Sequence, residues 1–412
     1  MEPDPPFYPA QARMTTPRAY RRAFADGRLT VDDQQLIEAF INERQAVRHI
    51  GQHRILKIRY DLISWRRFIS VPFREMAVGD LYAGLNAMKA GTNVRGTPFK
   101  QNTKHDLIMI LKPFVLWLIE NGDSTIPAEK VRGIRPPPID HNTTAPEGLL
   151  SADEIKRLLT GCRSTRDRAI IAVLYESGAR IGEVARLRWR DITFDDYGIG
   201  IHLHDTKENQ VRYARCTWAR EMLAAWKNVY PAELTPDAWV FLSSRKQAMN
   251  YGQIRQRVRM AAERAGLEKR VHLHLFRKSR ATHLIQQNYQ ESVIKKMLWG
   301  NLGTQMFRTY VVLSEGDIDA EILGRAGIET RPAKPDPLAP VPCPHCHAVC
   351  APTSRFCSAC GQALSAGAAE ELESAKGVIW RNPETVLEIA AEVQRRLDAA
   401  APRAGETAGE VA

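Results

Sequence analysis

Apolar residues recur at helical spacing through residues 30–122. In "LTVDDQQLIEAFINERQ", Leu36, Phe40 and Ile41 form one stripe, and Thr30 stands where an N-cap belongs. The stretches "HRILKIRYDLISWRRFI", "DLYAGLNAMKA" and "TKHDLIMILKPFVLWLIENG" repeat that spacing. The pattern predicts a compact unit of four helices.

Proline then replaces the helical pattern. The stretch "STIPAEKVRGIRPPPIDHNTTAPEG" has no helical periodicity and predicts a linker between two domains. Helical spacing returns at "LLSADEIKRLL", where Ser151 and Glu154 have the spacing of a capping box.

The period changes to two in "GIGIHLHDTKENQVRYAR". Ile199, Ile201 and Leu203 alternate with polar residues and glycine, and after a turn-like "DTKENQ" the alternation resumes at Val211 and Tyr213. This pattern predicts a β-hairpin. Helical spacing follows again over 251–328, so we expect a mainly α protein with a small antiparallel β-sheet in its second domain.

The charge of the chain suggests a polyanionic partner. The 412 residues carry a formal net charge of +11, and residues 365–412 hold 9 acidic and 5 basic side chains. The tail therefore carries −4 and the remainder +15, a distribution that favours nucleic acid over a membrane. The apolar stretch "LIMILKPFVLWLI" is interrupted by Lys112 and Pro113 and is too short to span a bilayer, and the N-terminus does not resemble a signal peptide. We expect a cytoplasmic protein without a membrane partner.

Five of the seven cysteines lie close together in "CPHCHAVCAPTSRFCSACG". Cys343 with Cys346 and Cys357 with Cys360 form two CxxC pairs, a spacing that suits a tetrahedral structural zinc ion. Cys350, His345 and His347 remain alternative ligands. The sequence predicts a small zinc-binding module whose metal supplies most of its folding energy.

Five further residues share a chemical logic, which is phosphoryl transfer without a catalytic metal. Arg180 and Arg277 can clamp the oxygens of a phosphodiester, and His274 precedes Arg277 by three residues on the same predicted helix. Lys207 lies on the hairpin turn and can protonate a leaving oxygen, while Tyr310 is the candidate nucleophile. Each of these residues alone also fits a plain structural role.

The stretches "GARIGEVARLRWRDI", "HLHLFRKSRATHL" and "MLWGNLGTQMFRTYVVL" resemble the three signature regions of the tyrosine recombinases, the phage-integrase family. The "FCSACG" segment is similar to integrases from archaea. Two positions depart from the family pattern, since Asn301 stands where histidine or tryptophan is common and Lys278 where many members have histidine. Asn301 can donate a hydrogen bond to phosphate but no charge. Glu183 either orients Arg180 or is a solvated helix acid.

The resemblance implies a site-specific DNA recombinase or integrase that cleaves and rejoins strands through a 3′-phosphotyrosine intermediate. It implies double-stranded DNA and a Holliday junction as partners, and a homo-oligomer on DNA, a tetramer in the synaptic complex. Two alternatives stay open: a topoisomerase-like strand nicker, and a DNA-binding regulator derived from a recombinase. On "YGQIRQRVRMAAERAG", Arg255, Arg257 and Arg259 either contact DNA or are merely solvated.

We therefore expect two DNA-binding domains that close as a clamp, followed by the zinc module. The tail predicts one more helix, with Asn382 as N-cap and a disordered end. The expected parts are an N-terminal arm at 1–29, a helical core-binding domain at 30–125, a linker at 126–148, a catalytic domain at 149–330, a zinc-ribbon-like module at 340–363, and a C-terminal helix and tail at 364–412.

Overall fold

The computed structural model describes residues 16–141, 145–204, 211–305, 307, 311–313, 315–326, 336, 338–381, 384, 387–392 and 395. The chain divides into two compact units, Met1–Ala145 and Pro146–Ala412. Within the described ranges, no helix is both long enough and apolar enough to cross a bilayer.

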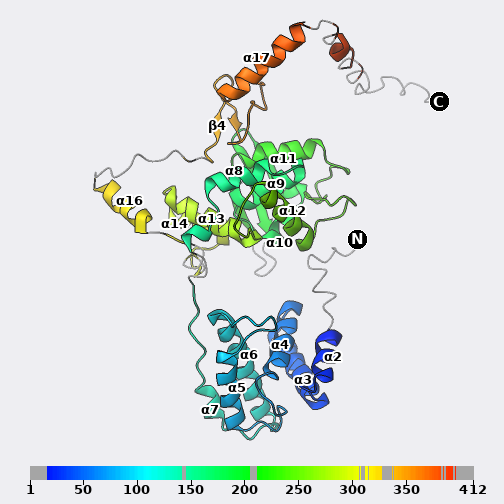
Figure 1. Ribbon diagram of the computed structural model, residues 1–412, viewed down its shortest axis with the longest axis vertical. Helices are drawn as coiled ribbons and strands as arrows, with labels where there is room; N and C mark the ends of the chain where they lie inside the picture. The colour runs from blue at the N-terminus through cyan, green and yellow to red at the C-terminus, as the bar shows by residue number, and fades with distance from the viewer. Residues whose placement is uncertain are drawn as a thin grey trace, which may run out of the picture. The chain divides into compact units, whose positions relative to one another are not determined.

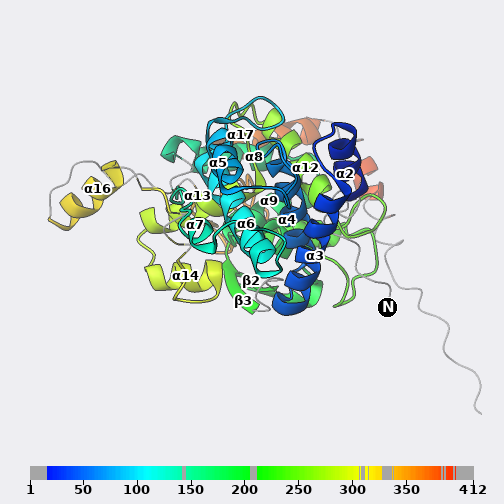
Figure 2. The same ribbon diagram turned by 90° about the horizontal axis from the view of Figure 1, so that it is seen from below.

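The first unit is helical, as the sequence predicts. Its helices are α2 (Thr16–Ala25), α3 (Val31–Arg48), α4 (Gln52–Trp65), α5 (Val78–Ala90), α6 (Gln101–Glu120) and α7 (Ala128–Arg132). The four helices expected over 30–122 are α3 to α6, and Thr30 caps α3 by accepting a hydrogen bond from the Asp33 amide at 3.0 Å. Helix α4 packs against α2, α3 and α6 (Figures 1 and 2).

Helix α7 lies in the stretch whose composition predicts a linker. Its Val131 is fully buried, and the Lys112 ammonium donates to the carbonyls of Arg132 at 2.6 Å and Ile134 at 3.0 Å. Further hydrogen bonds between side chains of α6 and the backbone of residues 137–140 hold the chain against the first unit as far as residue 140. The sequence pattern could not reveal α7, because only one of its side chains is buried and its other contacts use backbone carbonyls.

A buried carboxylate organises the core of the first unit. Asp33 is fully buried and accepts from the backbone amides of Thr30 at 3.0 Å and Phe73 at 2.8 Å. The buried guanidinium of Arg66 donates to the same carboxylate at 3.1 Å and to the carbonyls of Ile69 and Val71. One side chain thus ties the start of α3 to the end of α4 and to the loop beyond it.

The second unit combines helices with a three-stranded sheet, in agreement with the predicted fold class. Its main elements are α8 (Ala152–Thr160), α9 (Thr165–Glu176), α10 (Ile181–Ala185), β1 (Ile192–Asp195), β2 (Gly198–His204), β3 (Val211–Cys216), α11 (Ala219–Asn228), α12 (Tyr251–Arg264), α13 (Leu273–Gln286), α14 (Glu291–Trp299) and α16 (Glu315–Arg325). The predicted capping box of α8 is present, since the Glu154 amide donates to Ser151 at 3.2 Å and the Ser151 amide to Glu154 at 2.8 Å. Helix α9 is buried along residues 169–176 and contacts α8, α10, α11, α12 and α13.

The predicted hairpin exists, but the phase of its second strand differs from the prediction. The strands run antiparallel in the order β1-β2-β3, with Ile201 opposite Ala214 and Leu203 opposite Arg212. Val211 and Tyr213 are therefore exposed, whereas Arg212 is buried at 4% exposure. The sequence pattern placed the apolar side chains inward. Arg212 occupies the buried face because its guanidinium pairs with the buried carboxylate of Glu183.

Two short strands and a helix follow α16 in the second unit. Strands β4 (Val341–Pro342) and β5 (Val349–Cys350) pair antiparallel, and α17 spans Ala366–Arg381. The sequence pattern did not reveal α17. Of the helix expected further on, Asn382, Val393 and Leu397 lie outside the described residues, as do 401–412.

Replacing Asp33 with alanine should destabilise the first unit by about 3–5 kcal/mol, because Arg66 would stay buried without its carboxylate. Asp32→Ala is the matched control, since the neighbouring Asp32 pairs with Arg74 at the surface, where loss costs less than about 1 kcal/mol. Hydrogen exchange of the full chain, read by mass spectrometry over α3 to α6, measures both. Equal opening free energies for the two variants would contradict the role of Asp33.

Candidate active site

The loop between α9 and α10 places the first candidate residue. Arg180 is the N-cap residue of α10, and its backbone amide donates to the Glu183 carboxylate at 2.6 Å. Its guanidinium donates to the same carboxylate at 3.2 Å, and about a third of the Arg180 side chain (32%) stays exposed. Glu183 is buried rather than solvated, with 3% of its side chain exposed. The carboxylate therefore fixes both the backbone and the side chain of Arg180.

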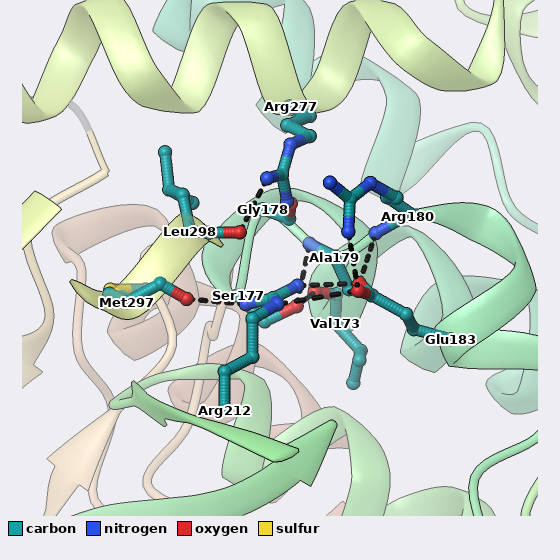
Figure 3. Close-up of polar contacts among 10 residues, drawn as sticks. All are labelled: Val173, Ser177, Gly178, Ala179, Arg180, Glu183, Arg212, Arg277, Met297 and Leu298. Atoms are coloured by element: carbon teal, nitrogen blue, oxygen red, sulfur yellow. Dashed lines mark hydrogen bonds and ion pairs between the residues drawn. The ribbon is translucent and has the colours of Figure 1, made fainter. Parts of the chain in front are cut away.

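A second arginine completes this contact from the sheet. Arg212 on β3 donates to Glu183 at 2.5 Å and 3.4 Å and to the carbonyl of Met297 near the end of α14. Figure 3 shows the Glu183 carboxylate between the guanidinium groups of Arg180 and Arg212. Both partners of the Arg212–Glu183 pair are almost fully buried. One carboxylate thus joins α10, β3 and, through Arg212, α14.

Arg277 reaches the same loop from α13. It is fully buried, and its guanidinium donates to the carbonyl of Gly178 at 2.7 Å and to the carbonyl of Leu298 (Figure 3). Its Cζ atom lies 5.0 Å from the centre of the Trp299 ring. The loop that presents Arg180 therefore also accepts a hydrogen bond from Arg277, so that the same loop contacts both arginines.

Gly178 makes this approach possible. Its φ of +56° lies in the left-handed region, which favours glycine. A Cβ atom at this position would overlap the Cδ2 atom of Leu298, whose carbonyl holds Arg277. The turn therefore depends on the absence of a side chain.

His274 stands three residues before Arg277 on α13. Loss of hydration around its ring lowers its pKa to about 4, and the positive charges of Arg277 and Lys278 act in the same direction. The residue keeps an exposed edge, which weakens the desolvation but leaves the direction unchanged. The imidazole is therefore neutral at pH 7.

The structure brings together Arg180, His274 and Arg277, three of the six predicted catalytic residues. Asn301 follows α14, whose C-cap Gly300 is left-handed, and it lies two residues beyond the Trp299 ring that contacts Arg277. Asn301 is partly exposed. Lys207 and Tyr310 lie outside the described residues.

Sequence patterns missed two residues of this region. Arg212 is one, because its alternation with Val211 and Tyr213 looked like a solvent-facing position. Thr282 on α13 is the other, since it accepts a hydrogen bond from the Val312 amide at 3.1 Å, two residues after Tyr310 in the chain. The side that Arg212 shares with Ile201 and Leu203 is visible only in the strand register of the structure. No local signal marks Thr282.

The four predicted metal ligands also come together. The Sγ atoms of Cys343, Cys346, Cys357 and Cys360 all lie within 4.8 Å of one another, and two of the distances, Cys343 to Cys360 and Cys346 to Cys357, are 3.6 Å. Zinc–sulfur bonds of about 2.3 Å in a tetrahedron require sulfur–sulfur distances of about 3.8 Å. The donor set and its spacing therefore fit zinc.

Both CxxC turns have the same backbone geometry. The His347 amide donates to the Cys343 carbonyl at 3.0 Å, and the Gly361 amide donates to the Cys357 carbonyl at 2.9 Å. His347 and Gly361, each directly after the second cysteine of its pair, both have positive φ. Amide hydrogen bonds, from Cys346 first and then His345, lower the pKa of the Cys343 thiol, which favours the thiolate that binds metal.

The cysteine module is attached to the rest of its unit through α11. The Glu221 carboxylate accepts from the Ala351 amide at 2.8 Å and from the Ser354 hydroxyl at 2.6 and 2.7 Å. Ala351 is fully buried. The region between the two CxxC pairs therefore docks on α11.

The chain is similar in sequence to known proteins. Residues 149–314 match the phage integrase family. The tyrosine recombinase XerC of Xanthomonas campestris pv. campestris (strain B100) is 26% identical over 294 residues, which cover 70% of this chain and 86% of that protein. Transposase A from transposon Tn554 of Staphylococcus aureus is 29% identical over 185 residues, which cover 42% of this chain and 50% of the transposase.

Solved structures share the fold. A lambda integrase tetramer bound to a Holliday junction superposes with a TM-score of 0.52 at 17% identity, over 67% of this chain and 76% of that one. The XerH site-specific recombinase in a post-cleavage complex with palindromic difH has a TM-score of 0.53 at 18% identity, over 71% of this chain and 84% of that one. These likenesses agree with the resemblance seen in the sequence: residues 149–314 form a phage integrase family domain, and the chain is similar to tyrosine recombinases.

Proposed function

We propose that this protein is a site-specific DNA recombinase that cleaves and rejoins strands through a 3′-phosphotyrosine bond at Tyr310. The observation that carries the proposal is the meeting of Arg180 and Arg277 around one loop, with Glu183 buried behind it. Two guanidinium groups fixed before the substrate arrives can hold the non-bridging oxygens of a scissile phosphate.

The remaining roles follow from charge and hydrogen-bonding capacity. Tyr310 attacks phosphorus, and the 5′ oxygen departs with a proton from Lys207. The neutral His274 can accept or donate a hydrogen bond at the phosphate, and Asn301 can donate one without adding charge. Charge on the phosphate is balanced by arginines, so the chemistry requires no catalytic metal. The bond energy kept in the phosphotyrosine allows religation to a different strand.

The partners we infer are duplex DNA and a Holliday junction, bound by a homo-oligomer that is a tetramer in the synaptic complex. The fold shared with the junction-bound lambda integrase tetramer supports this inference. On α12, Arg255 and Arg259 are exposed while Ile254 and Val258 are buried, so that helix offers cations to phosphates. Nothing among the described site residues favours a regulator without catalysis.

We also propose one structural zinc ion per chain at Cys343, Cys346, Cys357 and Cys360. The matching turn geometry of the two CxxC pairs and their sulfur distances support it. The zinc would fold the module and so present Ala351 and Ser354 to Glu221. Its role would be structural.

Tyr310→Phe should abolish a covalent protein–DNA adduct on a nicked or four-way-junction substrate while DNA affinity stays nearly unchanged, because only one hydroxyl is removed. Denaturing electrophoresis measures the adduct. Tyr289→Phe is the control, since Tyr289 is exposed and belongs to the same unit. An adduct formed by Tyr310→Phe would assign the nucleophile to another residue. Religation only to the original strand would favour the topoisomerase-like alternative.

Arg180→Ala and Arg277→Lys should each slow adduct formation by about 10²–10³, the usual loss for one preorganised charge-stabilising donor. Lysine at 277 keeps a charge but cannot reach both carbonyls of Gly178 and Leu298 while facing a phosphate. Asn301→Ala should slow the reaction less, because a neutral donor is lost. Single-turnover cleavage at saturating protein measures all three, and wild-type rates for both arginine variants would remove the basis of the proposal.

Purified protein should contain about one zinc per chain, and the double variant Cys343→Ser with Cys346→Ser should contain none. Atomic absorption or inductively coupled plasma spectrometry measures the metal. Cys350→Ser is the matched control, because Cys350 is a buried neighbour whose thiol donates to the Ala348 carbonyl. Equal zinc in the double variant and the wild type would contradict the assignment, and zinc lost from Cys350→Ser would change the ligand set.

A further inference from the structure

The chain on either side of Tyr310 is tied to the second unit at defined points. Before it, Phe307 packs at 6.3 Å between ring centres against Trp299, and the Lys295 ammonium lies 5.4 Å from the Phe307 ring. After it, the Val311 amide donates to the Phe307 carbonyl at 3.0 Å. Phe307 and Val311 both pack on the cluster formed by α13 and α14. These contacts bring the two flanks of the tyrosine together.

Thr282 supplies the direct link to α13. Its hydroxyl oxygen accepts from the Val312 amide at 3.1 Å, and the residue is 1% exposed. Arg277 lies five residues earlier on the same helix, about 7.5 Å along the axis at the usual rise per residue. A single rigid helix therefore holds both a ligand of the scissile phosphate and the backbone two residues after the nucleophile.

A second tie lies one turn further along α13. The Gln286 amide donates to the Asp317 carboxylate of α16 at 2.9 Å. This contact is exposed, so water competes with it and it constrains the segment less than the buried Thr282 bond does. The buried Thr282 hydrogen bond is therefore the contact that most strongly constrains the backbone next to residue 310.

We propose that Thr282 is a positioning residue for Tyr310, holding the following backbone so that the hydroxyl meets the phosphate clamped by Arg277. The proposal rests on the assignment of Tyr310 as nucleophile. Its physical basis is that attack requires a near-contact geometry, and a displacement of about 1 Å can cost up to about 10²-fold in rate. Thr282 acts through Val312 and does not itself touch the DNA.

The test compares Thr282→Val, which keeps the shape and removes the acceptor, with Thr282→Ser, which keeps the hydroxyl. Single-turnover adduct formation should slow by about 10-fold or more in the valine variant. The serine variant should recover most of the wild-type rate. DNA affinity, measured separately by fluorescence anisotropy, should be unchanged in both.

Ser279→Ala is the matched control for stability. Ser279 is a fully buried hydroxyl on the same helix and accepts from the Leu150 amide at 2.9 Å, a bond of the same kind in another direction. The melting temperatures of Ser279→Ala and Thr282→Val should fall similarly, but only the latter should lose cleavage rate. Equal cleavage losses in the two variants would mean that Thr282 is merely structural.

Two outcomes separate this proposal from the function on which it rests. If Tyr310→Phe abolishes the adduct while Thr282→Val cleaves at the wild-type rate, the positioning role is wrong and the nucleophile stands. If Tyr310→Phe still forms the adduct, the proposed function fails first, and a slow Thr282→Val would then report on a different nucleophile. Slow cleavage in Thr282→Val with rescue by serine supports the role of Thr282.

Discussion

The site depends on the hydrogen bonds that the buried carboxylate of Glu183 accepts from two arginines. The carboxylate lies between Arg180 and Arg212, and Arg212 in turn holds the Met297 carbonyl. A buried ion pair adds little net stability, but breaking one leaves an uncompensated charge. The arrangement of α10, β3 and α14 is therefore specified by an interaction that tolerates few alternatives.

The two buried arginines of the site differ in what surrounds their charge. Arg212 forms a buried ion pair with Glu183, and the carboxylate largely neutralises its positive charge. Arg277 is held by the carbonyls of Gly178 and Leu298, which are neutral groups. Burial is the main cause of the lowered pKa of the neighbouring His274, and the positive charge of Arg277 acts in the same direction. A cation that is already fixed and desolvated satisfies the condition for strong electrostatic stabilisation of the phosphate proposed to bind here.

Structural features that involve only residues close together in the chain could be predicted from the sequence. The caps at Thr30 and Ser151 and the two CxxC turns each involve residues three or four apart. The signature stretches that carry the resemblance to the tyrosine recombinases are likewise continuous in the sequence. Contacts between distant segments could not be predicted. Arg212 meets a carboxylate 29 residues away, so the alternation along β3 alone gave the wrong phase.

Distance along the chain also explains why Thr282 was missed. Its partner Val312 lies 30 residues further on, and a threonine within a helix carries no mark of such a bond. Helix α17 was missed for another reason, because its alanine-rich sequence has no pronounced apolar stripe. The linker prediction likewise overlooked α7, whose packing rests on one valine and on a lysine from α6.

Gly178 imposes a size limit on the active site. Any side chain there would displace Leu298, and the displacement would pass through the Leu298 carbonyl to Arg277. The position is therefore intolerant of substitution although it contributes no functional group. A change as small as one methyl group would therefore act on Arg277 through Leu298, without altering either arginine of the site. Gly178 thus constrains the geometry of the site through shape alone, as a residue without chemistry of its own.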